Sequence, residues 1–186
     1  MKNKKNILIT GGNRGIGNVL VKRLCQNHNV IFTVRNKQLG QKTLDSLNGK
    51  SANFIVMDVD TLISVERAVN VLRTRVDSID ILFNNAGILM DGLANDQTAL
   101  ATDEESILKT FNTNTLGVLR VTKFVEPLMK NGARIINISS GMGQLEDMQG
   151  GHLAYRLSKT ALNALTIILS KELAFKNISV NTICPG

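Results

Sequence analysis

Short apolar runs and amphipathic stretches alternate along this 186-residue chain, and the alternation limits the folds that it can adopt. Between the apolar runs lie stretches with helical periodicity, such as residues 62–76, where Leu62, Val65 and Val69 share one helical face. Strands that take turns with helices form βαβ units, whose right-handed crossovers produce a parallel sheet. The predicted strands are residues 6–10, 29–34, 52–59, 79–85, 133–139 and 178–184.

The predicted strands are almost continuously apolar, as strands buried on both faces should be. Further amphipathic stretches cover residues 19–25, 105–130 and 153–175. We therefore predict an α/β fold, a doubly wound parallel sheet of the Rossmann type in three layers. No internal repeat, low-complexity segment or Pro/Gly/Ser-rich linker divides the chain, so residues 1–186 are expected to form a single domain.

Composition argues against several other classes of protein. The formal charge of +7 comes from scattered Lys and Arg, and only 4% of residues are aromatic, which argues against nucleic-acid binding. No apolar run is long enough for a membrane span, and the short N-terminal run is not a secretory signal. Cys25 and Cys184 lie in no CxxC or His-rich motif, so neither a disulfide framework nor a metal site is predicted. Two thiols indicate a reducing compartment, and we expect a cytoplasmic protein.

A glycine-rich loop, "TGGNRGIG", joins the first predicted strand to the first predicted helix. Gly11, Gly15 and Gly17 have the spacing TGxxxGxG. Glycine tolerates positive φ and lets a pyrophosphate approach the backbone. The helix that starts here directs free N–H groups and its positive dipole end at the phosphates. Glycines also serve ordinary turns, but their place between strand and helix predicts dinucleotide binding.

The TGxxxGxG spacing differs from the GxGxxG of most dinucleotide domains and resembles that of the short-chain dehydrogenase/reductase family. Further motifs of that family follow in the right order and extend over nearly the whole chain. They are NNAG at 84–87, NTNTLG at 112–117, NISS at 137–140, YRLSK at 155–159 and PG at 185–186. The wording of the glycine loop and of residues 34–42 is most similar to the carbonyl-reductase-like branch. The resemblance implies one NAD(P)-binding domain that also carries the catalytic residues.

Tyr155 and Lys159 are four residues apart, so on a helix they project from one face. A free phenol has a pKa of about 10, too high for easy proton exchange at neutral pH. A nearby ammonium stabilises the phenolate, and we expect it to lower the pKa of Tyr155. Tuning of this kind is what a general acid or base needs. A lone pair of this spacing could be an ordinary surface pair, but the other motifs favour catalysis.

By resemblance, three more side chains complete the catalytic set. Ser140 would donate a hydrogen bond to the substrate oxygen, whereas its neighbour Ser139 fits a turn serine. Asn114 would distort its helix and hold a proton-relaying water, and polar surface decoration fits Asn112 better. Lys159 would also bind the nicotinamide ribose.

The end of the second predicted strand indicates the cofactor. NAD enzymes usually carry an acid there to hold the ribose 2′-hydroxyl, but this chain has Arg35 and no acid follows. Arg14 supplies a second cation, and together they favour NADP(H), whose 2′-phosphate an arginine can pair with. By resemblance, Asp58 would contact the adenine amino group and Val59 would flank the ring. The complete set of expected cofactor contacts is Gly11, Asn13, Arg14, Gly15, Ile16, Gly17, Arg35, Asp58, Val59, Asn85, Ala86, Gly87, Tyr155, Lys159, Pro185 and Gly186.

The leading hypothesis is an NADPH-dependent reductase that converts an aldehyde or ketone to an alcohol. Members of the family usually continue beyond the position of Gly186, so we expect this chain to bind cofactor weakly and turn over poorly. A non-catalytic NADP-binding regulator is the alternative. A non-catalytic assembly partner is a third reading. In relatives, helices equivalent to residues 105–130 and 153–175 pair between subunits, which implies a homodimer or homotetramer. Substrate choice would lie in residues 88–104 and 141–152, which do not identify the substrate.

Overall fold

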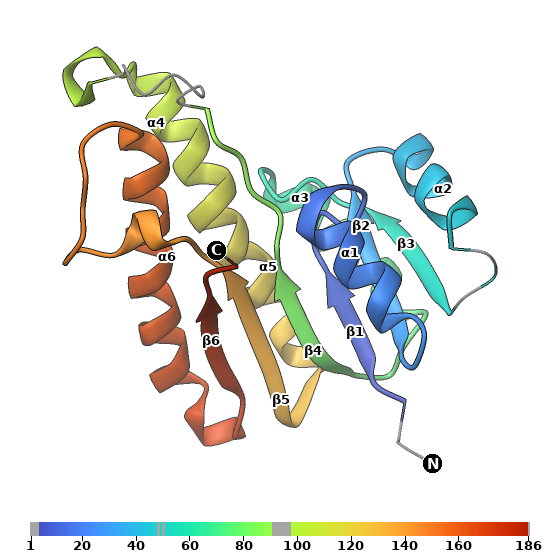
Figure 1. Cartoon of the computed structure of the whole chain (residues 1–186). Coiled ribbons are helices and arrows are strands. Elements are labelled where there is room, and N and C mark those ends of the chain that lie inside the picture. Colours follow the sequence, from blue (N-terminus) through green and yellow to red (C-terminus); the bar gives the residue numbers. More distant parts are fainter. Residues whose placement is uncertain (1–3, 48, 50, 91–97, 186) are drawn as a thin grey trace.

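The computed structural model describes residues 4–47, 49, 51–90 and 98–185. Within them one parallel sheet has the strand order β3-β2-β1-β4-β5-β6 (Figure 1). The order reverses between β1 and β4, which defines a doubly wound sheet and confirms the predicted fold class. The strands are β1 (Asn6–Ile9), β2 (Asn29–Val34), β3 (Ala52–Val56), β4 (Ile79–Asn84), β5 (Met129–Ile138) and β6 (Ser179–Ile183).

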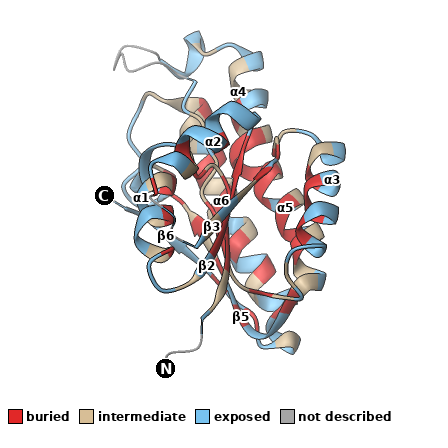
Figure 2. Ribbon diagram, turned by 90° about the vertical axis from the view of Figure 1, so that its right-hand side faces the viewer, coloured by how far each residue is buried: buried red, intermediate tan, exposed pale blue. Residues whose placement is uncertain are grey.

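Helices cover both faces of the sheet and bury its side chains (Figure 2). Helices α1 (Gly15–Leu24) and α2 (Lys37–Asp45) pack on one face, around Phe32 and Val21. Helices α3 (Leu62–Arg73), α5 (Gly117–Val125) and α6 (Leu153–Glu172) pack on the other, around Leu82 and Ile135. Helix α4 (Glu104–Phe111) packs against α6. The two cores explain why the strands are apolar on both faces.

The predicted helix over residues 105–130 is correct in its continuity and wrong in its end. It runs through a π-helical turn, η2 (Asn112–Leu116), and closes in a 3-10 turn, η3 (Glu126–Leu128). Pro127 lies in that last turn, and β5 begins directly after it at Met129, four residues earlier than predicted. Proline has no N–H for a helical hydrogen bond and ends the helix here.

Helix α2 is short and polar, and the periodicity predicts no helix over its residues. Its start is fixed by a side-chain cap, because Asn36 Oδ1 accepts a hydrogen bond of 3.0 Å from the Leu39 N–H. Because few residues of this helix are buried, the sequence shows only a weak helical periodicity of apolar residues here.

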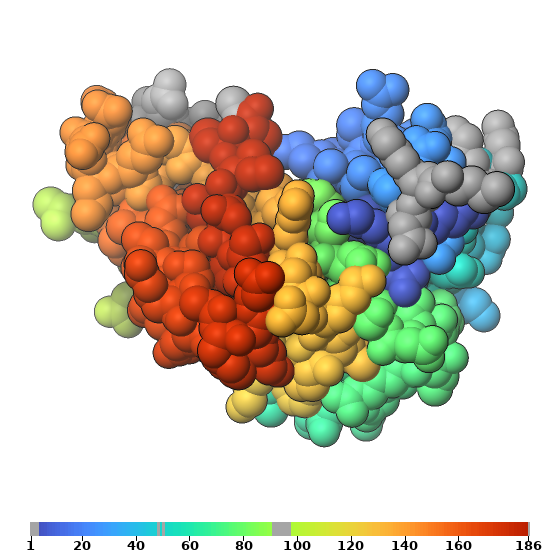
Figure 3. All heavy atoms as spheres, turned by 90° about the horizontal axis from the view of Figure 1, so that it is seen from below, coloured from blue at the N-terminus to red at the C-terminus, as the bar shows by residue number. Residues whose placement is uncertain are grey.

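At the amino ends of the strands, Asp80 fastens neighbouring strands to each other. Its carboxylate accepts a hydrogen bond of 2.8 Å from the Asn6 N–H and pairs with Lys130. Seen from this side, the C-terminal part of the chain, in red and orange, lies opposite the blue N-terminal part, with the gold segment of β5 between them (Figure 3). These contacts join the amino ends of neighbouring strands. The predicted site residues lie at the opposite, carboxyl ends of the strands.

Candidate active site

The glycine loop leaves the carboxyl end of β1 in a conformation that glycine permits. Gly11 has φ of 68°, and a Cβ added at Gly17 would lie 2.4 Å from the Gly11 carbonyl oxygen. A Cβ added at Gly15 would meet open space. The first turn of α1 has no acidic residue, and its N-cap, Arg14, makes no capping hydrogen bond through its side chain. These open N–H groups beside side-chain-free backbone fit a dinucleotide pyrophosphate.

Hydrogen bonds connect the glycine loop after β1 to the segment after β4, at the point where the strand order reverses. Thr10 Oγ1 accepts hydrogen bonds from the N–H groups of Asn85 (2.9 Å) and Ala86 (3.0 Å). In return, Asn85 Nδ2 donates to the carbonyls of Thr10 (2.9 Å) and Gly11 (3.1 Å). The Asn85 side chain therefore positions the glycine loop. Thr10 is a site residue that sequence reasoning missed, although it is the first residue of the loop motif.

The remaining expected cofactor residues line the same end of the sheet. Arg14 and Arg35 are both exposed, and within the described ranges neither guanidinium has a hydrogen-bond or ion-pair partner. Ile16 is 43% exposed and Asn13 is half-buried. Pro185 is exposed after β6, and Gly186 lies outside the described residues.

Asp58 and Val59 follow β3 with different exposure. Asp58 is partly exposed, and its Oδ1 accepts a hydrogen bond of 3.1 Å from the Asp60 N–H. Val59 is only 7% exposed and packs against Gly117, where an added Cβ would lie 3.0 Å from Val59 Cγ2. Its side chain packs in the core, and its place beside an adenine ring stays a prediction.

Asn114 lies in the π-helical turn η2 and is fully buried. Its Oδ1 accepts from the Ile88 N–H at 2.8 Å, and its Nδ2 donates to the Ile88 carbonyl at 2.9 Å and to Ser158 Oγ at 3.0 Å. Ser158 Oγ in turn donates to the Tyr155 carbonyl at 2.8 Å. The turn therefore fastens the segment after β4 to the helix that carries Tyr155. This agrees with the expected distortion, since π-turns recur at functional sites.

Asn112, in the same turn, is not surface decoration. Arg120 Nη2 donates to its Oδ1 at 2.6 Å, and Asn112 Nδ2 donates to the Asp60 carbonyl at 3.2 Å. The turn is thus docked on the loop that follows β3. This correction depends on contacts between distant segments, which local sequence does not encode.

The two serines after β5 have different partners. Ser139 is 5% exposed and donates a hydrogen bond of 2.6 Å to Asn163 Oδ1, so it fastens the loop to α6. Ser140 Oγ accepts from the Met142 N–H at 3.2 Å and shares a side-chain hydrogen bond with Tyr155. The structure brings Ser140 and Tyr155 together as predicted.

Lys159 projects toward the same place from one turn further along α6. Its Nζ lies 5.5 Å from the centroid of the Tyr155 ring and donates a hydrogen bond of 2.8 Å to the Ile138 carbonyl. A Cβ added at Gly87 would lie 3.1 Å from Asn114 Oδ1 and 3.8 Å from Lys159 Nζ. Gly87 therefore lets the segment after β4 approach both side chains.

The pKa values of this pair differ from the expectation. Burial raises the pKa of Tyr155 above its usual value of 10, a hydrogen bond from Ser140 opposes that rise, and Cys184 adds to it. Burial lowers the pKa of Lys159 to about 8. The expected lowering of the Tyr155 pKa by the ammonium is wrong for this structure, because burial favours the neutral form of both groups.

Neither a metal site nor a membrane-spanning helix is found within the described ranges. No group of three or more His, Cys, Asp or Glu side chains is arranged to hold a metal ion. No helix in that part of the chain has both the length and the apolar character needed to cross a bilayer.

The sequence matches the family described as short chain dehydrogenase over residues 5–186. It is 33% identical to carbonyl reductase family member 4 of Danio rerio, over 96% of this chain and 73% of that protein. It is also 33% identical to the 3-oxoacyl-[acyl-carrier-protein] reductase FabG of Chlamydia trachomatis, over 98% of this chain and 73% of that one.

Solved structures give the same relationship. The NADPH-bound carbonyl reductase from chicken fatty liver has a TM-score of 0.88 at 28% identity, covering 99% of this chain and 80% of its own. The RhlG/NADP complex of Pseudomonas aeruginosa has a TM-score of 0.88 at 30% identity, covering 98% of this chain and 72% of its own. The chain is therefore shorter than these relatives.

Proposed function

The chain belongs to the short-chain dehydrogenase/reductase family of oxidoreductases, and we propose that it reduces an aldehyde or ketone to an alcohol with NADPH. The observation that carries this proposal is the hydrogen-bonded pair of Ser140 and Tyr155, with Lys159 Nζ 5.5 Å from the Tyr155 ring. All three residues lie at the carboxyl end of the sheet, beside the glycine loop, where ligands of doubly wound folds bind.

NADP(H) is the proposed cofactor. Gly11, Gly15 and Gly17 would hold the pyrophosphate, and the exposed guanidinium groups of Arg14 and Arg35 would pair with the 2′-phosphate. No acidic side chain follows β2 to repel that phosphate. Two of the similar solved structures are described as an NADPH-bound reductase and an NADP complex.

The proposed chemistry uses the chain's residues to hold the carbonyl oxygen and supply a proton. A bound reduced nicotinamide supplies the hydride to the carbonyl carbon. Ser140 Oγ and Tyr155 Oη would donate hydrogen bonds to the carbonyl oxygen, and the Tyr155 proton would pass to that oxygen as its negative charge develops. The raised pKa keeps Tyr155 protonated at neutral pH, which is the form that this step needs.

Lys159 and Asn114 would support the proton transfer. With a pKa of about 8, Lys159 exchanges its proton near neutrality and could reprotonate Tyr155 through water. Asn114 holds the segment after β4 and the helix that carries both residues, so its role is positioning.

The substrate class includes simple carbonyl compounds and 3-oxoacyl thioesters. Relatives with printed names of both kinds match at similar identity, 33% for a carbonyl reductase and 33% for a 3-oxoacyl reductase. A panel of aldehydes, ketones and 3-oxoacyl thioesters distinguishes the two substrate classes. Both reactions oxidise NADPH, so the same assay gives a rate for every compound.

Exposed apolar side chains support the proposed homodimer or homotetramer through residues 105–130 and 153–175. On α4 and α6, which pack side by side, Leu108 is 68% exposed, Ile167 63% and Ile168 53%. Exposed apolar surface of this kind favours association. Light scattering on the purified protein measures the mass directly.

Both cysteines are thiols and not halves of a disulfide, which supports a cytoplasmic location.

The decisive experiment compares the wild type with Tyr155→Phe in NADPH oxidation. The variant keeps the ring but removes the proton, so turnover should fall by about 10²-fold or more while NADPH binding is retained. Wild-type rates in the variant would refute the mechanism. NADPH binding with no oxidation on any carbonyl would instead favour the alternative, a non-catalytic NADP-binding regulator.

A further inference from the structure

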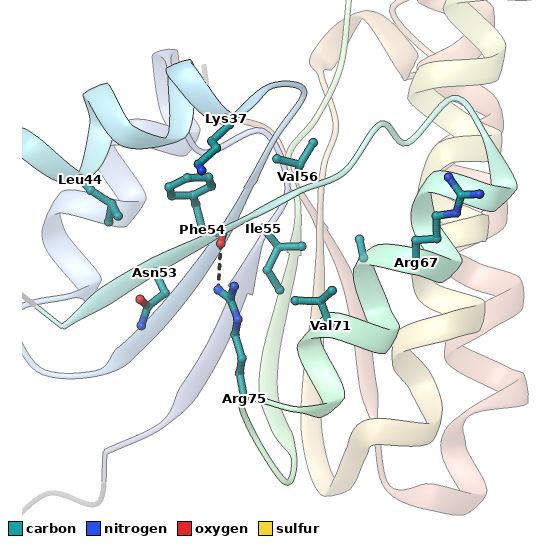
Figure 4. Close-up of a pocket in the computed structure, with 10 residues that line it drawn as sticks. Lys37, Leu44, Asn53, Phe54, Ile55, Val56, Arg67, Val71 and Arg75 are labelled. Carbon is teal, nitrogen blue, oxygen red and sulfur yellow. Dashed lines mark hydrogen bonds between the residues drawn. The ribbon is translucent and has the colours of Figure 1, made fainter.

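A groove of about 400 Å³ lies along the outer edge of β3, between α2 and α3 (Figure 4). Strand β3 is the end of the sheet, so this groove is on the side of β3 that faces away from β2. We propose that it binds an organic anion with an apolar tail. It is separate from the crevice that holds Tyr155, which lies beyond β1 and β4 in the strand order.

The floor of the groove is apolar and partly exposed. Phe54 and Val56 come from β3, and Val71 comes from the facing side of α3. Val56 is 45% exposed and Val71 is 41% exposed. An apolar tail laid on this floor would remove those surfaces from water, which is favourable at about 25 cal/mol per Å².

The rim of the groove is cationic. Lys37 reaches it from α2, and Arg67 and Arg75 reach it from α3 and the turn that follows (Figure 4). No acidic residue lines the groove, and neither ion pair of the described residues involves any of these three side chains. An anionic head group would therefore meet positive charge that has no acidic partner in the groove.

The edge of β3 adds backbone donors. Met57 N–H donates to Val34 and Ser51 accepts from Val30, so these residues face β2. Because alternate residues of a parallel strand face opposite neighbours, the N–H groups of Phe54 and Val56 point into the groove. The Phe54 carbonyl is already bonded to Arg75 Nη1 at 2.9 Å. That contact obstructs an added β-strand and favours a small anion as occupant.

The alternative explanation for the same charges is protection of an exposed sheet edge against pairing with another chain. In that case the groove binds nothing. The two explanations differ in whether an anion with an apolar tail binds saturably, and the experiment is built on that difference.

The test titrates ¹⁵N-labelled protein with decanoate, below the concentration at which it forms micelles, and follows the amide signals of Phe54 and Val56. Decan-1-ol, with the same tail and no charge, is the matched ligand, and decyl phosphate tests a phosphate head group. We expect saturable shifts at both amides, with and without saturating NADP⁺, and binding of decan-1-ol weaker by about tenfold or more.

Arg67→Gln removes one rim cation whose side chain has no hydrogen bond within the described residues, so the variant should fold. We expect it to weaken decanoate binding by about tenfold, because a charge-assisted contact is lost. Arg73→Gln is the control, since Arg73 is an exposed arginine of α3 that does not line the groove. Equal effects of the two substitutions, equal binding of decan-1-ol, displacement by NADP⁺, or no shift at Phe54 and Val56 would each overturn the proposal.

Discussion

Lys159 Nζ lies 5.5 Å from the centroid of the Tyr155 ring while it donates a hydrogen bond of 2.8 Å to the Ile138 carbonyl. The amine is therefore held by the end of β5, and its distance from the phenol is set by the sheet as well as by the helix. Burial at this point favours the neutral form of both side chains, so that the pKa of Tyr155 rises and the pKa of Lys159 falls to about 8. The stability of the protein should depend on pH through this lysine.

Lys159→Met should show that dependence. The pKa of Lys159 is about 8 in the folded state, against an ordinary lysine value of 10.5, so between these values the unfolded chain binds a proton that the folded protein lacks. Stability of the wild type therefore rises with pH in this window, whereas methionine does not titrate. Relative to the variant, the wild type should gain about 2–3 kcal/mol in free energy of unfolding between pH 7 and 10.

Urea denaturation at pH 7, 8, 9 and 10 measures the difference, and the titrations of groups distant from Lys159 cancel between the two proteins. Lys42→Met, at an exposed position of α2, is the control for the loss of a lysine charge. A difference for Lys159→Met that does not change with pH would show that its amine is not desolvated in the folded state.

Ser139→Ala and Ser140→Ala should have opposite consequences. Ser139 bonds Asn163 at 2.6 Å in a buried position, so its loss should lower the free energy of unfolding by about 1–3 kcal/mol and leave kcat nearly unchanged. Ser140 would bond the substrate oxygen, so its loss should lower kcat by about 10²–10³-fold, and the loss of its hydrogen bonds to Met142 and Tyr155 should lower the free energy of unfolding by about 1 kcal/mol. Urea denaturation and NADPH oxidation give the two readouts. A loss of kcat that is larger in Ser139→Ala would reverse the proposed roles.

Much of the architecture could be predicted because it depends on local periodicity. The six strands and the long α3 and α6 helices are predicted from apolar runs and helical spacing, and βαβ handedness predicts a parallel sheet covered by helices. The strand order β3-β2-β1-β4-β5-β6 is known only from the structure. Helix α2 was missed because one Asn36 cap and a polar nine-residue segment give little periodic signal. The π-helical turn at Asn112–Leu116 is predicted by the resemblance only as a distortion around Asn114.

The site was predictable in its membership and less so in its contacts. Spacing places Tyr155 and Lys159 on one helical face, but the sign of the pKa shift of Tyr155 depends on burial, which the sheet and loops determine. The roles of Thr10 and Ser158 depend on hydrogen bonds to segments 75 and 44 residues away, which no local pattern encodes. Both residues nevertheless lie inside motifs, in TGxxxGxG and directly before Lys159.

Asn114→Ala should destabilise the protein by about 2–4 kcal/mol, because it leaves the Ile88 N–H and carbonyl and Ser158 Oγ without a partner that they now have. The matched control is Thr110→Val, one turn earlier on α4. Thr110 is fully buried and its hydroxyl has no hydrogen-bond partner among the described residues, so this change should be neutral or stabilising by about 1 kcal/mol. Thermal or urea denaturation compares the two. Equal destabilisation would mean that the Asn114 hydrogen bonds contribute nothing beyond packing.

Arg35→Ala should weaken the preference for NADPH over NADH. Arg35 is exposed directly after β2, and its guanidinium has no partner within the described ranges, so it is available to a 2′-phosphate. Loss of one charge-assisted pair should raise the KM for NADPH by about 10- to 100-fold and leave the KM for NADH nearly unchanged. Lys42→Ala removes the same charge from an exposed position of α2 and should change neither value by more than about twofold, because distant surface charges are screened by salt. If both cofactors lose affinity equally in Arg35→Ala, the side chain supports the fold of the crevice and does not recognise the phosphate.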